Sequence, residues 1–141
     1  MSFLKEEELK NILPINGPSV EEVKKYIDKY NDELIVIKCG GSVLIDPNLF
    51  DIFIKDVAVL KKIGLSPIIV HGGGKRINSK LTELNIQSNF IKGLRVTDDK
   101  TINIVEDVLI ELNKEIVNAL KDQSCEATNA FCQSKLAKCQ R

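Results

Sequence analysis

Two short apolar runs, each followed by glycines and then by a helical pattern, constrain the fold of this chain more than any other feature. Residues 34–37 read Leu-Ile-Val-Ile, and residues 68–70 read Ile-Ile-Val. Continuous runs of this kind are typical of strands buried on both faces of a parallel sheet. Parallel strands need a crossover connection, and a helical pattern lies between the two runs. The sequence therefore predicts an α/β fold, a three-layer α/β/α sandwich with a mainly parallel sheet.

Local signals place helices around these strands. Ser19 and Glu22 form a capping-box pattern before one amphipathic helix, and Asp46-Pro47 is a start signal for another that ends near Gly64. Thr97 is expected to cap a long helix that follows it. The other expected elements are a helix within residues 3–13, a helix over about 75–84, and an extended stretch over 86–97 with a turn near Lys92-Gly93.

The pattern divides the chain into three parts. Residues 1–33 are expected to form an N-terminal helical extension, and residues 34–120 an α/β lobe. Residues 121–141 are polar and small, give no strand pattern, and are expected to form an atypical tail.

Composition argues against several functions. Twenty lysines and arginines balance twenty aspartates and glutamates, whereas proteins that bind nucleic acid or anionic membranes show a basic excess. No apolar run approaches the roughly 18–20 residues of a membrane helix, and the first residues lack the apolar stretch of a secretory signal. We therefore expect a cytoplasmic protein without nucleic-acid or membrane partners.

The cysteines are expected to be reduced and to bind no metal. The sequence has one histidine, and neither it nor the spacing of the cysteines fits a metal-binding pattern. The cysteines are Cys39, Cys125, Cys132 and Cys139.

The two glycine clusters lie where the C-terminal ends of two parallel strands should meet. Lys38 and Gly40-Gly41 end the first strand, and Gly72-Gly74 follow the second. Glycine lets backbone N–H groups approach a ligand, and each cluster precedes a helix N-terminus, which favours an anion. Two such loops could hold one phosphate group between them, and the Lys38 ammonium could neutralise its charge. This combination suits phosphoryl transfer. The alternative is a pair of tight turns with a lysine that only reaches solvent, since neither a Walker A loop nor a dinucleotide fingerprint is present.

Two further side chains are candidates near this edge. Arg95, in the block G-L-R-V-T over residues 93–97, could pair with a carboxylate of a ligand or form a surface ion pair. His71 is expected to be a hydrogen-bonded structural residue rather than a base.

Taken together, three blocks resemble the N-terminal half of the amino acid kinase family. They are V-I-K-C-G-G-S at 36–42, I-V-H-G-G-G at 69–74 and G-L-R-V-T at 93–97, in family order over about residues 20–120. The last block is most similar to that of the acetylglutamate kinases. The resemblance implies ATP-dependent phosphorylation of the γ-carboxylate of N-acetyl-L-glutamate in arginine biosynthesis, with Mg²⁺ accompanying the ATP.

The resemblance also implies roles for individual residues. Lys38 matches the lysine that stabilises charge on the transferred phosphoryl group, and Gly40-Gly41 match the phosphate-binding loop. Gly72-Gly73 match glycines that contact the substrate, and Arg95 matches the arginine that grips a substrate carboxylate. Lys75 stands where the family often has proline.

Family members are nearly twice as long as this chain, and their second half carries most of the nucleotide site. The resemblance therefore implies a truncated acetylglutamate kinase, inactive by itself, whose full-length form is a dimer or a hexamer. The helix over 19–30 resembles an extension that joins subunits and takes part in feedback inhibition by arginine. The alternative is that this helix folds back on its own domain.

Two other functions stay open. One is a different amino acid kinase, acting on aspartate, glutamate, carbamate or UMP. The other is a non-catalytic module for ligand binding or subunit interaction.

Overall fold

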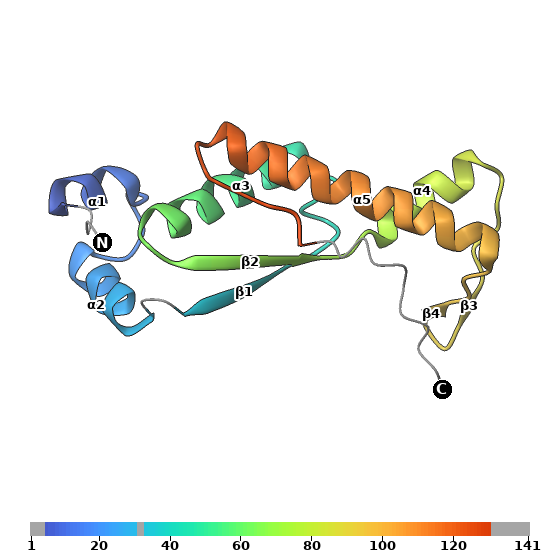
Figure 1. Cartoon of the computed structure of the whole chain (residues 1–141), viewed down its shortest axis with the longest axis horizontal. Coiled ribbons are helices and arrows are strands. Elements are labelled where there is room, and N and C mark those ends of the chain that lie inside the picture. The colour runs from blue at the N-terminus through green and yellow to red at the C-terminus, as the bar shows by residue number, and fades with distance from the viewer. Residues whose placement is uncertain (1–4, 31–32, 131–141) are drawn as a thin grey trace.

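Two parallel strands, β1 (Leu34–Cys39) and β2 (Ser66–His71), form the central sheet of the computed structural model, which describes residues 5–30 and 33–130 (Figure 1). The register pairs the first residues of the two strands and continues to their last residues, Cys39 and His71. The α/β class and the parallel pairing predicted from the sequence are confirmed.

The crossover between the strands is the helix α3 (Pro47–Lys62). It begins at Asp46, whose carboxylate accepts hydrogen bonds from the backbone N–H groups of Asn48 and Leu49 at 2.9 and 3.1 Å. It ends before Gly64, whose φ of +97° lies in the left-handed region that glycine adopts readily. Both ends agree with the sequence signals.

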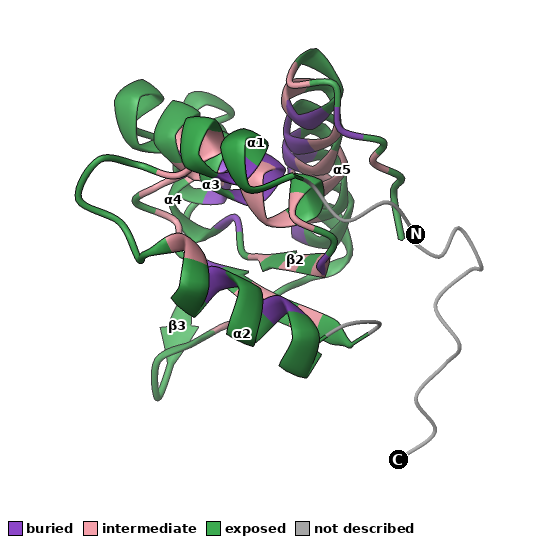
Figure 2. Ribbon diagram, turned by 90° about the vertical axis from the view of Figure 1, so that its left-hand side faces the viewer, coloured by how far each residue is buried: buried purple, intermediate pink, exposed green. Residues whose placement is uncertain are grey.

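Two more helices follow β2. The helix α4 (Gly74–Glu83) begins directly after the second glycine cluster, and α5 (Asp99–Asp122) is the longest helix described. In Figure 2 the buried stretches of α5 lie on the side that faces α3 and the sheet. These helices and the adjacent side of the sheet enclose one hydrophobic core, formed by Cys39, Leu44, Ile54, Val57, Ala58, Ile77, Leu81, Val108, Leu112, Ile116, Leu120 and Cys125.

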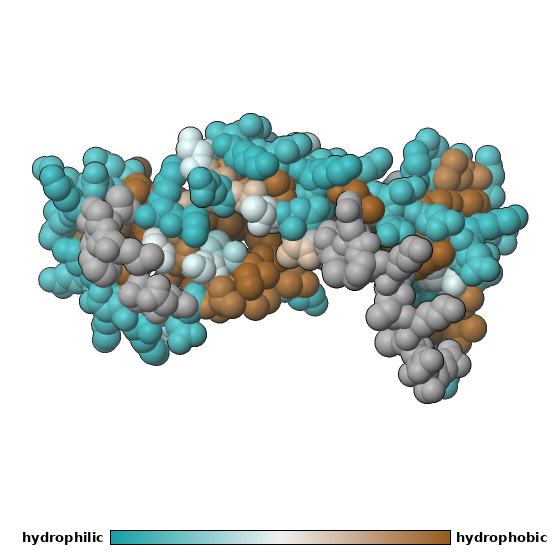
Figure 3. Space-filling view, viewed as in Figure 1, coloured by the Kyte–Doolittle hydropathy of each residue, from teal (hydrophilic) through white to brown (hydrophobic). Residues whose placement is uncertain are grey.

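The face of the sheet opposite this core is exposed, whereas the sequence predicted strands buried on both faces. Leu34 and Val36 are 67% and 66% exposed, and their neighbours Ile68 and Val70 are 40% and 50% exposed. Figure 3 shows hydrophobic side chains gathered on the surface where β1 and β2 lie in Figure 1. The prediction is wrong for these strands because, among the described residues, helices cover only one face of a two-stranded sheet.

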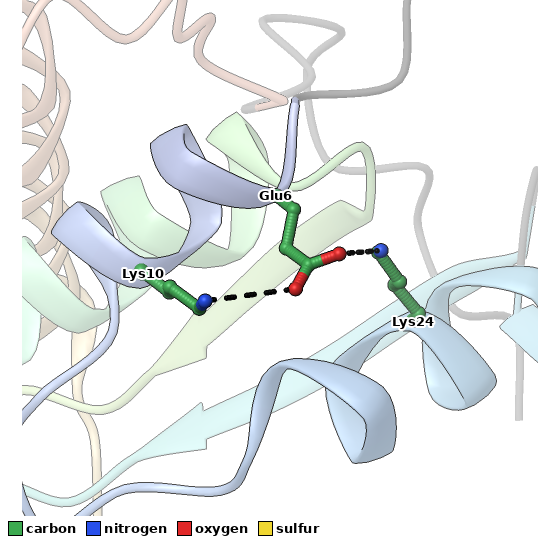
Figure 4. A network of polar contacts seen from close by, with 3 residues as sticks. All are labelled: Glu6, Lys10 and Lys24. Atoms are coloured by element: carbon green, nitrogen blue, oxygen red, sulfur yellow. Dashed lines mark hydrogen bonds and ion pairs between the residues drawn. The ribbon is translucent and has the colours of Figure 1, made fainter.

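The N-terminal helices α1 (Glu6–Ile12) and α2 (Val20–Tyr30) form a cluster of their own. Leu9, Val23 and Ile27 are buried together there, and Ile63 at the end of α3 packs against them. The Glu6 carboxylate joins the two helices by an ion pair with Lys24 of α2 at 3.0 Å, and it also pairs with Lys10 of its own helix at 3.6 Å (Figure 4). The predicted capping box of α2 is confirmed, since the Glu22 carboxylate accepts from the Ser19 backbone N–H and hydroxyl at 2.9 Å each.

The extended stretch predicted after α4 is a short antiparallel hairpin of β3 (Phe90–Ile91) and β4 (Leu94–Arg95). Lys92 and Gly93 form its turn with φ values of +48° and +80°, as a two-residue hairpin turn requires. The predicted cap of α5 is wrong by one residue. Asp98 rather than Thr97 is the N-cap, because its carboxylate accepts from the Thr101 backbone N–H at 2.7 Å.

The segment after α5 has no helix or strand over residues 124–130, the part of the predicted tail that the structure describes. Cys39 and Cys125 are buried free thiols, while Cys132 and Cys139 lie outside the described residues. Over the described ranges, we find no helix with the length and apolar character needed to cross a membrane.

Candidate functional site

The register of the sheet places the two glycine clusters side by side. Cys39 lies opposite His71, so Gly40 and Gly72 leave the sheet at the same edge. This is the edge at which open α/β sheets bind ligands. The structure therefore brings together the two loops that the sequence singled out.

The first turn of α4 connects these loops through side chains. Lys75 donates a hydrogen bond from Nζ to the Ser42 hydroxyl at 3.1 Å, which reaches the first glycine loop. Arg76 donates to the Leu44 carbonyl at 3.5 Å and forms an ion pair with Glu115 of α5 at 2.6 Å. The N-terminus of α4 is thus anchored both to the first loop and to α5.

The glycines of this edge differ in what surrounds them. A Cβ added at Gly40, Gly41 or Gly72 would meet no atom within 4 Å. Gly73 is buried, and a Cβ there would lie 2.9 Å from Leu109 Cδ2. The lack of a side chain at Gly73 therefore permits close packing against α5, whereas the first three glycines leave their backbone open to a ligand.

Lys38 lies at the end of β1 with its side chain exposed. Side chains alternate along a strand, so Lys38 shares the uncovered face of the sheet with Val36. Its register partner is Val70. Within residues 5–30 and 33–130, no hydrogen bond or ion pair to the Lys38 ammonium occurs, so an unpaired positive charge stands next to the glycine loops.

Arg95 is placed by the hairpin and by α4. Its Nη2 donates a hydrogen bond to the Asn78 amide oxygen, and the guanidinium lies 4.8 Å from the centre of the Phe90 ring. Its Nη1 is buried and has no hydrogen-bond partner in the described structure. Arg95 does not form the surface ion pair that was the alternative from sequence, since the only partner described for its guanidinium nitrogens is a neutral amide.

His71 and Cys39, the last residues of β2 and β1, also lie at this edge, and neither has a proposed catalytic or binding role. The His71 Nδ1 is buried and unpartnered within the described chain, so the expected hydrogen bond is not found at this atom. Cys39 is 3% exposed, and burial raises the pKa of its thiol, which disfavours a thiolate.

Sequence reasoning missed two side chains of this site. The sequence marks Lys75 only as a departure from a family pattern, and it predicts no role for Asn78. Both act across 17 or more positions of sequence, a separation at which no local pattern predicts a contact. The described residues contain no group of three or more His, Cys, Asp or Glu side chains arranged to hold a metal ion.

The sequence of the chain is similar to a known family and to several named enzymes. The sequence profile of the amino acid kinase family matches residues 33–136. The chain is 75% identical over 127 residues to the acetylglutamate kinase of Pelagibacter ubique (strain HTCC1062), covering 90% of this chain and 44% of that protein. It is 49% identical over 102 residues to the acetylglutamate kinase of Caldanaerobacter subterraneus subsp. tengcongensis, covering 72% of this chain and 34% of that protein. The chain therefore spans less than half the length of these curated relatives.

A solved structure shares the fold. The N-acetylglutamate synthase of Neisseria gonorrhoeae, solved in complex with coenzyme A and N-acetyl-glutamate, superposes with a TM-score of 0.62 at 19% identity. The match covers 74% of this chain and 24% of that one. At this identity the likeness concerns the fold alone.

Proposed function

The chain belongs to the amino acid kinase family, and we propose that it forms the acetylglutamate-binding part of an acetylglutamate kinase. The observation that carries this proposal is the 75% identity over 127 residues to an enzyme of that name. The enzyme would transfer the γ-phosphoryl group of ATP to the γ-carboxylate of N-acetyl-L-glutamate and so form an acyl phosphate. In this proposal residues 34–120 form the substrate-binding lobe, and residues 1–33 are an extension to it.

The geometry of the sheet edge supports this chemistry. Phosphoryl transfer depends on positioning and on neutralising the charge of the transferred group. We assign charge neutralisation to the exposed ammonium of Lys38 and phosphate contacts to the backbone N–H groups of Gly40-Gly41. Gly72-Gly73 would contact the substrate through the backbone, and Arg95 would bind its second carboxylate through Nη1. Magnesium would enter with the nucleotide, as the MgATP co-substrate.

Ligand selectivity tests the proposal on the 141-residue chain. We expect N-acetylglutamate to shift the backbone NMR signals of Gly72 and Arg95 in a saturable titration, with glutamate, aspartate and UMP binding more weakly. Arg95→Lys should weaken N-acetylglutamate binding by about 1.5–3 kcal/mol, because the lysine ammonium cannot reproduce the charge-assisted hydrogen bond proposed for Nη1 of the guanidinium. Preferential binding of UMP or aspartate would favour another kinase of the family. Binding unaffected by Arg95→Lys would remove Arg95 from the site.

The assembly of the enzyme is a further part of the proposal. We propose a homo-oligomer, a dimer or hexamer in the full-length protein, with α2 as a subunit contact and arginine as a feedback ligand. Tyr26 and Tyr30 support it, because they stack at 6.3 Å between ring centroids on α2 and are 55% and 37% exposed. Light scattering of the chain and of a variant lacking residues 1–30, each with and without arginine, tests it. The same number of subunits per particle for both proteins, with and without arginine, would contradict it.

A further inference from the structure

Asn78 and Arg95 come from different elements and meet beside the candidate site. Arg95 ends β4, and Asn78 lies in the second turn of α4. The Asn78 amide oxygen accepts a hydrogen bond from Arg95 Nη2, while Arg95 Nη1 is buried and unpartnered in the described structure. The guanidinium is therefore held through Nη2, and the N–H groups of Nη1 remain available as donors.

The hairpin supplies the second constraint on this guanidinium. Phe90 is the register partner of Arg95, and the centre of its ring lies 4.8 Å from the guanidinium carbon. A ring face restricts the position of the guanidinium through cation–π attraction, and the bond to Asn78 restricts its rotation. A side chain that is ordered before binding loses less conformational entropy when a ligand arrives.

We propose that Asn78 is a positioning residue that holds Arg95 with Nη1 presented to a carboxylate of the ligand. The proposal rests on the proposed function, which takes that ligand to be N-acetylglutamate. Because α4 begins at Gly74, the same hydrogen bond fixes the hairpin relative to the second glycine cluster. Asn78 thereby sets the distance between the group that binds the carboxylate and the loops that face the phosphate.

Three variants of the 141-residue chain separate this role from a general effect on folding. Asn78→Ala removes the acceptor, and Asn78→Asp keeps an oxygen acceptor at the same place. Ser79→Ala is the matched control on the next position of α4. Among the described residues, the Ser79 hydroxyl bonds only to the Lys75 carbonyl of its own helix, at 3.1 Å. Circular dichroism establishes that each variant is folded.

The first measurement is the rotation of the Arg95 guanidinium by nitrogen-detected NMR. A held guanidinium rotates slowly and gives separate Nη signals. We expect separate signals in the unsubstituted chain, in Asn78→Asp and in Ser79→Ala, and a single averaged signal in Asn78→Ala. Separate signals that persist in Asn78→Ala overturn the proposal.

The second measurement is the affinity for N-acetylglutamate in the same samples. We expect Asn78→Ala to weaken binding by about tenfold, the effect of one hydrogen bond to a charged group. Ser79→Ala should bind as the unsubstituted chain does. Asn78→Asp should keep the guanidinium held but weaken binding, because its carboxylate adds a negative charge beside an anionic ligand. An averaged Arg95 signal with unchanged affinity also overturns the proposal. If the unsubstituted chain does not bind N-acetylglutamate, the proposed function fails, and the guanidinium signals alone then decide whether Asn78 holds Arg95.

Discussion

Adjacent glycines at the end of β2 have different surroundings, and substitution by alanine separates the roles proposed for them. Gly72 is open to solvent, so Gly72→Ala should leave the free energy of unfolding unchanged. It should weaken N-acetylglutamate binding if the substrate contact proposed for Gly72 is correct, because the added methyl group would stand in the way of that contact. Gly73→Ala should destabilise the fold by about 1–3 kcal/mol, the usual effect of overpacking a core. Its added Cβ would crowd Leu109 and Leu112 at 2.9 and 3.2 Å.

Urea denaturation and ligand titration of both variants measure these effects. Equal stability of the two variants would contradict the packing role of Gly73, and unchanged binding by Gly72→Ala would contradict the contact proposed for Gly72.

At the scale of elements, the capping box of α2 links a local hydrogen bond to a pH dependence. Hydrogen bonds from the Ser19 backbone N–H and then from its hydroxyl hold the pKa of Glu22 below its usual value. A lowered pKa in the folded state means that this contribution to stability is complete above the ordinary glutamate pKa and is lost as the pH falls through the lowered value. Ser19→Ala should therefore raise the Glu22 pKa. Separately, the loss of the hydroxyl that caps α2 should destabilise this helix by about 1 kcal/mol.

A carboxyl NMR titration follows the Glu22 pKa, and hydrogen exchange of the α2 amides follows the stability of that helix. Ser79→Ala is the control, because it removes a serine hydroxyl from a helix without a capping role. A Glu22 pKa that is the same with and without the Ser19 hydroxyl would show that the backbone N–H alone sets it.

The elements that the sequence predicted well are those whose signals are local. The Asp46 cap, the Gly64 end of α3 and the Lys92-Gly93 turn each depend on neighbouring residues, and the structure has all three. Thr97 and Asp98 are adjacent residues of which either can cap a helix, so the sequence placed the cap one residue too early. The exposure of Val36 depends on what covers the sheet, which no local pattern records.

In the candidate site too, some features follow from local sequence patterns and others depend on the tertiary structure. The glycine loops meet because parallel strands end at one edge, and this follows from the strand pattern alone. The bond between Asn78 and Arg95 requires the positions of α4 and of the hairpin together, so it could be found only from the structure.

At the scale of the whole molecule, the uncovered face of the sheet is an apolar surface. Val36 and Val70 lie on it and are 66% and 50% exposed. Exposed apolar patches promote association, so the chain should self-associate at micromolar concentration. Val36→Lys should reduce the average mass in light scattering, while Ile52→Lys, a matched change at a 55% exposed position on α3, should not. An equal effect of both substitutions would indicate that added charge, rather than this face, governs association.

The extent of the chain leads to a prediction about catalysis. In the proposed site, Lys38 and the two glycine loops face the phosphate, and the chain spans 44% of the Pelagibacter ubique relative. Removing a single donor that stabilises a developing charge typically lowers a rate by about 10²–10³. We therefore expect the 141-residue chain to bind N-acetylglutamate but to form no acyl phosphate above background. Trapping with hydroxylamine in the presence of MgATP measures this product as a hydroxamate. Lys38→Met is the control, because hydroxamate formation that is lost in this variant would come from the site itself and would contradict the prediction.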